Sequence, residues 1–216
     1  MKEKTWRKWE VAGLFFVLIW GNLFHFVYNW SGQNDLVAAI ASVNESVWEH
    51  VKLLTIPWAV WSVVEAVALR RGKGGVLMAR ALGLLAGAAF IIAAYYTYVG
   101  VTGANVSFVN IIIFQVAAIV AFFVSWRLQD RSMLRGKFWA VLGGILLLGM
   151  VALAVYWTYF PPALPLFTAP QTGQTGRPTG ELRSVKRWGD HLFFLDRCRQ
   201  MVYNIHNKVT EGKVGV

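Results

Sequence analysis

Five long apolar stretches, separated by short clusters of charge, constrain this chain more than any other feature of its sequence. They occupy residues 9–30, 46–69, 76–100, 106–126 and 138–160. A bilayer core about 30 Å thick requires roughly 20 apolar residues in a helix, and each stretch is long enough. The sequence therefore predicts an all-α, polytopic membrane protein whose five transmembrane helices lie within residues 1–160.

The charge composition narrows the class of protein further. Charged residues make up 15% of the 216 residues, against about 25% in soluble domains, which excludes an ordinary soluble domain. The net charge of +10 does not indicate a nucleic-acid partner, because most Lys and Arg before residue 160 lie at the ends of apolar stretches. The single cysteine, Cys198, excludes an intramolecular disulfide and a CxxC metal site.

The Lys and Arg residues lie on alternate connections, which predicts how the spans cross the membrane. The connections 31–45 and 101–105 contain none, whereas three other segments contain four each, twelve in total: Lys2, Lys4, Arg7, Lys8, Arg70, Arg71, Lys73, Arg80, Arg127, Arg131, Arg135 and Lys137. Short cytoplasmic loops carry the excess of Lys and Arg. We expect a bacterial cytoplasmic membrane protein with its N-terminus inside and its C-terminal tail outside.

Residues 161–216 have a different character from the spans. Pro161 and Pro162 end the fifth span, because proline removes a helical hydrogen-bond donor, and a Pro/Gly-rich linker follows. Apolar residues at three- and four-residue steps predict an amphipathic tail helix at about residues 190–209. This helix lies either against membrane lipids and the protein itself or against a protein partner.

Polar side chains gather at the outer ends of the first two spans. If these spans are antiparallel neighbours, His25 and His50 lie at similar depth in the outer leaflet, and Glu45, Glu49 and Lys52 share one helical face. Ionisable groups inside a membrane are costly and therefore candidates for function. The candidate ligand-binding residues are His25, Tyr28, Asn44, Glu45, Glu49, His50 and Lys52.

Three interpretations of this outer cluster remain open. The first is a polar network that only holds the two spans together. The second is a small-molecule or metal site, with His25, Glu49 and His50 as metal ligands and Glu45 as a further carboxylate. The third is a b-type haem with His25 and His50 as axial ligands.

A second group of charges lies deeper, near the cytoplasmic ends of the spans. Glu65 in the second span and Arg80 in the third are expected at similar depth, which predicts a buried ion pair with Glu10 as an alternative partner for Arg80. A carboxyl group that carries a proton is the other interpretation of Glu65.

Three short motifs, at His25–Asn34, Val43–Leu53 and Pro165–Phe167 with Pro170, resemble an uncharacterised family of small bacterial multi-span membrane proteins. The resemblance covers about residues 9–175. An acidic residue usually precedes the family's proline, where this chain has Ala169 before Pro170. The resemblance implies the membrane class and no particular activity, but all three motifs fall on the predicted outer side.

The sequence thus favours an integral membrane protein with an outer-leaflet polar site, between its first two spans, that binds a small ligand, a lipid headgroup or an ion. It leaves open whether the protein is an enzyme. A non-catalytic accessory or scaffold subunit of a membrane complex is the alternative, and a haem-bearing electron-transfer subunit is a third.

Overall fold

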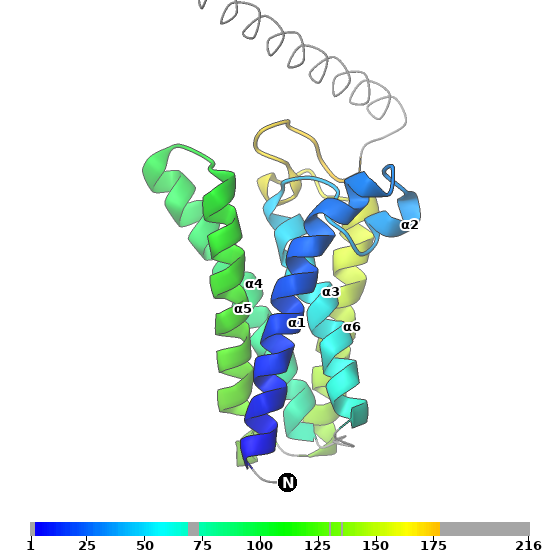
Figure 1. The fold of residues 1–216 in the computed structure, drawn as a ribbon, viewed down its shortest axis with the longest axis vertical. Helices are drawn as coiled ribbons and strands as arrows, with labels where there is room; N and C mark the ends of the chain where they lie inside the picture. The colour runs from blue at the N-terminus through cyan, green and yellow to red at the C-terminus, as the bar shows by residue number, and fades with distance from the viewer. Residues whose placement is uncertain (1–2, 69–73, 130, 135, 178–216) are drawn as a thin grey trace, which may run out of the picture. The chain divides into compact units, whose positions relative to one another are not determined.

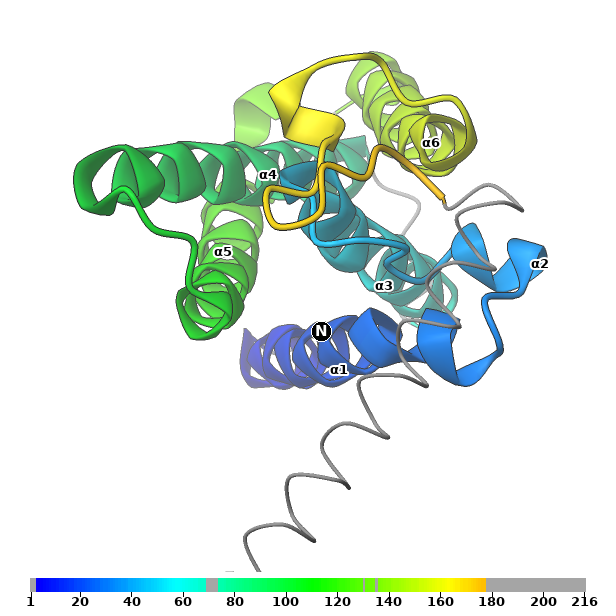
Figure 2. The same cartoon turned by 90° about the horizontal axis from the view of Figure 1, so that it is seen from above.

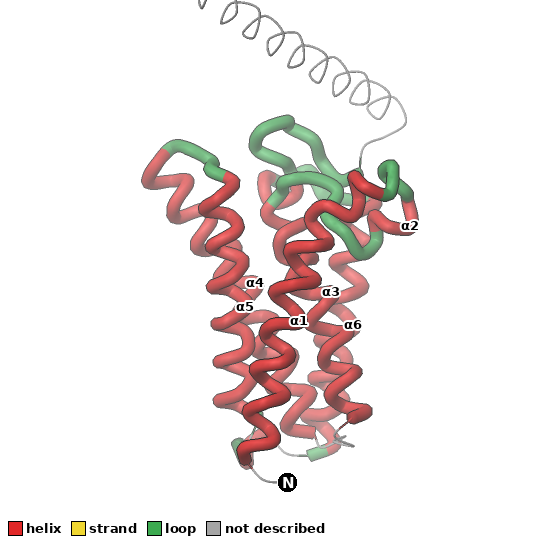
Figure 3. The backbone as a smooth tube through the Cα atoms, in the orientation of Figure 1, coloured by secondary structure: helices red, strands yellow, loops and turns green. Residues whose placement is uncertain are grey.

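The structure, a computed structural model, is built from helices (Figures 1 and 3). It describes residues 3–68, 74–129, 131–134 and 136–177, so the predicted tail helix at about 190–209 lies outside the described residues. Its long helices are α1 (Glu3–Trp30), α3 (Val47–Ala68), α4 (Gly74–Thr102), α5 (Ser107–Leu128) and α6 (Lys137–Tyr159). The short ones are α2 (Asp35–Ala38), η1 (Ser132–Leu134) and η2 (Pro165–Phe167).

Five segments are long and apolar enough to cross a membrane: Lys8–Trp30, Val47–Ala68, Val76–Thr102, Ser107–Leu128 and Lys137–Tyr159. The prediction of an all-α, five-span membrane protein is confirmed. Helices suit this environment because each one satisfies its backbone hydrogen bonds internally, where no water is present to do so. In the part of the chain that the structure describes, β-structure is limited to one bridge, between Thr168 and Thr175.

The helix bundle has two ends with different connections (Figure 1). We call the end where α1 finishes at Trp30 and α3 begins at Val47 the site end, and the opposite end, near Lys8, the N-terminal end. Which end faces the cytoplasm remains a prediction from the Lys and Arg pattern.

Helix α3 is the central element of the bundle (Figure 2). It contacts α1, α4, α5 and α6, and 61% of its span is buried, against 22% for α1 and 17% for α6. Its ionisable side chains are Glu49, His50, Lys52 and Glu65, and all are buried. They therefore face protein instead of lipid, as expected for polar groups at membrane depth.

Small residues let α4 approach its neighbours closely. A Cβ atom added at Gly87 would lie 2.8 Å from the Leu54 side chain of α3 and 2.9 Å from Ala121 of α5. Gly83, one turn earlier, lies against the Ala121 carbonyl and Ser125. These small residues therefore serve helix packing.

A proline in α3 brings α1 close to it. Pro57 has no N–H group, so the carbonyl of Leu53 lacks its usual helical donor. Gly21 of α1 lies against that carbonyl, since a Cβ there would be 3.1 Å from the Leu53 oxygen. This close approach keeps His25, one turn farther along α1, near the first turn of α3.

Residues 31–46 and 160–177 cover the site end, and we call them the cap. Segment 160–177 leaves α6 and passes over the start of α3 (Figure 2). Phe167 packs against both Trp48 and Trp157, with ring centroids 5.3 and 5.1 Å away. Arg177 closes the cap with an ion pair of 2.6 Å to Asp35.

Candidate functional site

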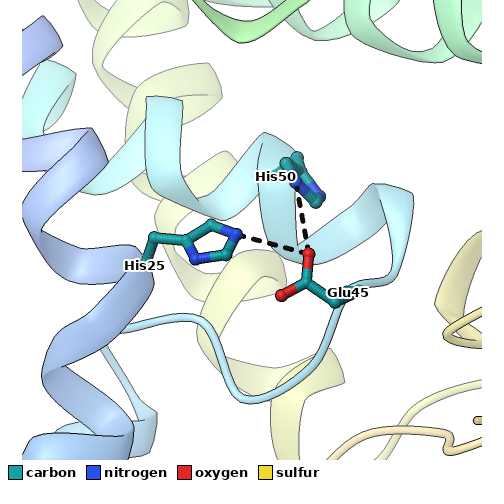
Figure 4. Close-up of side chains that lie close together, drawn as sticks. All are labelled: His25, Glu45 and His50. Carbon is teal, nitrogen blue, oxygen red and sulfur yellow. Dashed lines mark ion pairs between the residues drawn. The ribbon is translucent and has the colours of Figure 1, made fainter. Parts of the chain in front are cut away.

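Two histidines and one carboxylate converge at the site end (Figure 4). His25 comes from α1, His50 from the first turn of α3, and Glu45 from the cap just before that helix. Glu45 Oε2 lies 3.3 Å from His25 Nε2 and 3.9 Å from His50 Nε2. The three ligand atoms all lie within 4.8 Å of one another, close enough for one metal ion to contact each. We call this group the histidine cluster.

The orientation of His50 is set by the backbone of its own helix. Its Nδ1 lies 2.9 Å from the carbonyl oxygen of Ser46, four residues earlier. A carbonyl only accepts hydrogen bonds, so Nδ1 carries a proton, and when the ring is neutral its Nε2 presents a lone pair toward Glu45. Metal-binding histidines commonly show this arrangement, in which one nitrogen donates to the protein and the other faces the ion.

The cluster is open to the surroundings on one side only. The side chains of His25 and Glu45 are 23% and 38% exposed, whereas that of His50 is 9% exposed. Behind His50 lies a cavity of about 10 Å³ between α3, α4 and α5, bounded by Tyr95 and Asn110. A volume of this size holds about one water molecule. An ion would therefore enter from the His25 and Glu45 side.

A second group of charges lies beside the histidine cluster but is closed. Lys52, which is fully buried, has its Nζ 2.6 Å from Glu49 Oε2, and it donates to Thr158 Oγ1 at 2.7 Å and to the Ala38 carbonyl at 2.9 Å. An ammonium group has three hydrogens, so these contacts use its full capacity. We call this group, which joins α3, α6 and the cap, the lysine cluster.

Glu49 is as fully engaged as Lys52. Its Oε2 also accepts from the backbone N–H of Val43 at 3.0 Å, and its Oε1 lies 3.1 Å from the Thr158 hydroxyl. Of the two carboxylates expected near His25 and His50, Glu45 is the one that faces both histidines, whereas Glu49 faces Lys52 and Thr158. The shared helical face expected for Glu45, Glu49 and Lys52 is absent, because α3 begins at Val47 and Glu45 precedes it.

The remaining candidate ligand residues lie outside the histidine cluster. Asn44 donates to the Gly176 carbonyl at 2.9 Å and accepts from the Ser46 N–H at 2.8 Å, so it joins the two cap segments at the start of α3. Tyr28 is buried in an apolar group with Ala38 and Val43. Both residues hold the cap in place, and this holds Glu45 in front of the histidines.

The third group lies at the N-terminal end, where Arg80 of α4 reaches two carboxylates. Its Nη2 donates to Glu65 of α3 and, at 2.9 Å, to Glu10 of α1. The sequence offered these two residues as alternative partners, and the structure brings both to the same nitrogen. The guanidinium also lies 5.3 Å from the ring centroids of Trp58 and Phe122. We call Glu10, Glu65 and Arg80 the arginine cluster.

Sequence reasoning missed three residues that complete these groups: Ser46, whose carbonyl orients His50; Thr158, which joins the lysine cluster from α6; and Gln129, beside Glu10. For Ser46 a signal was present, because it stands three residues before Glu49 in the pattern of a helix N-terminus. The Ser46 hydroxyl indeed accepts from the Glu49 N–H at 3.4 Å. Nothing in the sequence indicates which helix faces Thr158 or Gln129.

The chain matches a known protein family over a range that includes the histidine, lysine and arginine clusters. Residues 1–177 match DUF6512, a family of unknown function. The chain belongs to DUF6512. The predicted resemblance to an uncharacterised family over about residues 9–175 is thereby confirmed. No curated protein and no solved structure matches the chain, so DUF6512 gives it a family without an activity.

Proposed function

We propose that this member of DUF6512 is an integral membrane protein that binds a divalent transition-metal ion through His25, Glu45 and His50. The observation that carries the proposal is the convergence of ligand atoms. With Nδ1 of a neutral His50 donating to Ser46, the Nε2 lone pair faces the Glu45 carboxylate oxygen, 3.9 Å away. Electron-rich atoms in this arrangement repel one another unless a cation lies between them.

The donor set and its spacing suit such an ion. Two imidazoles and one carboxylate hold zinc in three-ligand sites and iron in the facial triad, both of which leave positions open for water or substrate. Zinc bonds of about 2.0–2.2 Å put neighbouring tetrahedral ligands about 3.3–3.5 Å apart. The 3.3 Å between His25 and Glu45 matches this spacing, and the 3.9 Å between His50 and Glu45 would have to shorten when an ion binds.

Other ligands for the site find less support. A lipid headgroup phosphate would meet the Glu45 carboxylate, which repels it, while Lys52 has no donor left to offer. A haem would require its plane between His25 and His50, where Glu45 Oε2 lies within 3.3 and 3.9 Å of the two rings. The lysine cluster favours a second candidate function, a scaffold subunit, because it fixes the cap without any ligand.

We also infer that the site end faces the outside of a bacterial cytoplasmic membrane, with the N-terminus in the cytoplasm. The inference rests on the Lys and Arg residues of the N-terminal segment and of the alternate connections. Leu36 at the site end and Met133 at the opposite end are matched probes, 84% and 81% exposed. In a Cys198→Ser background, an impermeant thiol reagent should label Leu36→Cys in intact cells and Met133→Cys only after permeabilisation; the reverse pattern contradicts the inference.

Titration of the purified full-length protein with Zn²⁺ tests the metal site. The wild-type protein should bind one ion that Glu45→Gln or His50→Gln weakens by more than about 100-fold, since even outer-shell partners of a metal are worth 10–100-fold. Asp35→Asn is the matched control, because this carboxylate lies in the same cap but pairs with Arg177. His191 and His206 of the tail contribute an equal background in every variant.

The scaffold alternative predicts a different result from the same titration. If the histidine cluster only joins α1 to α3, the wild type and Glu45→Gln will bind Zn²⁺ equally, and the substitution will change thermal stability alone. That outcome would overturn the metal proposal and leave the scaffold role as the better account.

A further inference from the structure

The arginine cluster contains more negative than positive charge. Glu10 and Glu65 contribute two carboxyl groups and Arg80 contributes one guanidinium, and all three side chains are more than nine-tenths buried. Among the described residues, the charged groups that act on Glu10 are Arg80 of α4 and Glu65 of α3, and the neighbour from the end of α5, Gln129, is neutral. With both carboxyl groups ionised, the cluster would hold an uncompensated negative charge at membrane depth.

Several polar atoms of the cluster also lack partners. Of the buried atoms in the described part of the chain that make no hydrogen bond of normal geometry, six lie in the cluster or in Gln129 beside it: Glu10 Oε2, Glu65 Oε1, Arg80 Nε, Arg80 Nη1, Gln129 Nε2 and Gln129 Oε1. Gln129 is 5% exposed and lies beside the Glu10 carboxyl group. Buried groups of this kind are costly to leave unpaired, so their concentration at one place indicates that a further species belongs there.

We propose that the arginine cluster is a proton-binding site, in which Glu10 holds the proton and Glu65 remains ionised as the counter-ion of Arg80. A proton supplies the single positive charge that the cluster lacks. A metal cation would have to lie beside the Arg80 guanidinium, which repels it. Water alone would pair some of the six atoms but would leave the charge uncompensated.

Glu10 is better placed than Glu65 to exchange the proton. It lies only two residues inside the start of the first span at Lys8, and its side chain is 9% exposed against 3% for Glu65. Protons can therefore reach it from the aqueous phase at the N-terminal end. Glu65, in the more enclosed position, keeps its contact with Arg80 in both states.

Gln129 can serve both protonation states of Glu10. When the carboxyl group is protonated, its O–H donates to the amide oxygen of Gln129. When it is ionised, rotation of the amide presents the N–H₂ group to the carboxylate. The reaction only adds a proton to a carboxylate oxygen or removes it, so no other reactant is required. The site is independent of the histidine cluster at the opposite end.

Infrared spectroscopy of the full-length protein at neutral pH tests the proposal, because a protonated carboxyl group and a carboxylate absorb at different frequencies. The wild type should show the band of one protonated carboxyl group per chain. Glu10→Gln should abolish that band, and Asp35→Asn, which removes an exposed carboxylate in the cap, should leave it unchanged.

Two further variants separate the proposal from a simple buried acid. Glu65→Gln should also abolish the band, because Glu10 then becomes the counter-ion of Arg80 and gives up its proton. Arg80→Gln should double the band, since neither carboxyl group retains a counter-ion. A wild-type spectrum without a protonated carboxyl band at neutral pH, or a band that survives Glu10→Gln, would overturn the proposal, whether or not Arg80→Gln folds.

Discussion

The lysine cluster and the arginine cluster lie on the same helix, α3, and differ in how completely their polar atoms are paired. In the first, one carboxylate faces one ammonium group, and each N–H of Lys52 has an acceptor. In the second, two carboxylates share one nitrogen of Arg80, and four buried atoms of these three side chains make no hydrogen bond to the described residues.

The difference shows how to separate structural charges from functional ones in a membrane protein. A complete cluster such as that of Lys52 needs no further species. Its structural role, to join the cap to α3 and α6, is enough to explain it. An incomplete cluster requires a proton, an ion or another ligand. By this criterion the arginine cluster is a candidate site, whereas the lysine cluster is not.

Removing the charge of Lys52 should have the largest effect on stability. Lys52→Met leaves Glu49 buried without a counter-ion, and breaking a buried pair in this way costs about 3–5 kcal/mol. Equilibrium unfolding in mixed micelles measures the loss. The double variant Lys52→Met/Glu49→Leu is the control, because it removes both charges and should recover most of the stability. A cost below about 1 kcal/mol for Lys52→Met, the range of exposed pairs, would contradict the assignment of a closed structural cluster.

Removing the hydroxyl of Thr158 should have an intermediate effect. Thr158→Val keeps the shape of the side chain but leaves a donor of Lys52 and Oε1 of Glu49 without their partner. Unsatisfied buried groups cost about 1–3 kcal/mol, and the same unfolding measurement applies. Thr158→Ser retains the hydroxyl and loses one buried methyl group, so it should cost about 0.5–1.5 kcal/mol, less than Thr158→Val. A larger loss for Ser than for Val would contradict the role given to the hydroxyl.

The sequence predicted the helices and the approximate depth of the charges. Five apolar stretches sufficed for the spans, and the shared depth of Glu65, Arg80 and Glu10 followed from their distances to the span ends. The sequence could not distinguish Glu45 from Glu49 as the carboxylate beside the histidines, because the prediction treated residues 45–52 as one helix. The bend before Val47 turns Glu45 toward the histidines and leaves Glu49 facing α6. The roles of Thr158 and Gln129 could not be predicted, because the sequence does not show which spans are neighbours.

Removing the charge of Glu65 should have the smallest effect of the three. Glu65→Gln leaves Arg80 paired with Glu10, which ionises in its place, so the cost should be about 0.5–1.5 kcal/mol, the net worth of a hydrogen bond. The difference between the losses of unfolding free energy in Lys52→Met and Glu65→Gln, measured in the same micelles, is the most direct comparison of the lysine and arginine clusters. Equal losses in the two variants would show that Glu10 does not replace Glu65.

The histidine cluster supplies the function proposed for this protein, and X-ray absorption at the zinc edge tests it most directly. Outer-shell scattering from imidazole rings reports how many histidines bind the ion. In protein loaded with one equivalent of Zn²⁺, the account predicts two imidazoles together with oxygen donors. His25→Ala should remove one of the two imidazoles, and replacing His191 and His206 of the tail with alanine should change nothing. The account would be contradicted if the imidazole scattering decreased when the tail histidines were replaced and stayed unchanged in His25→Ala.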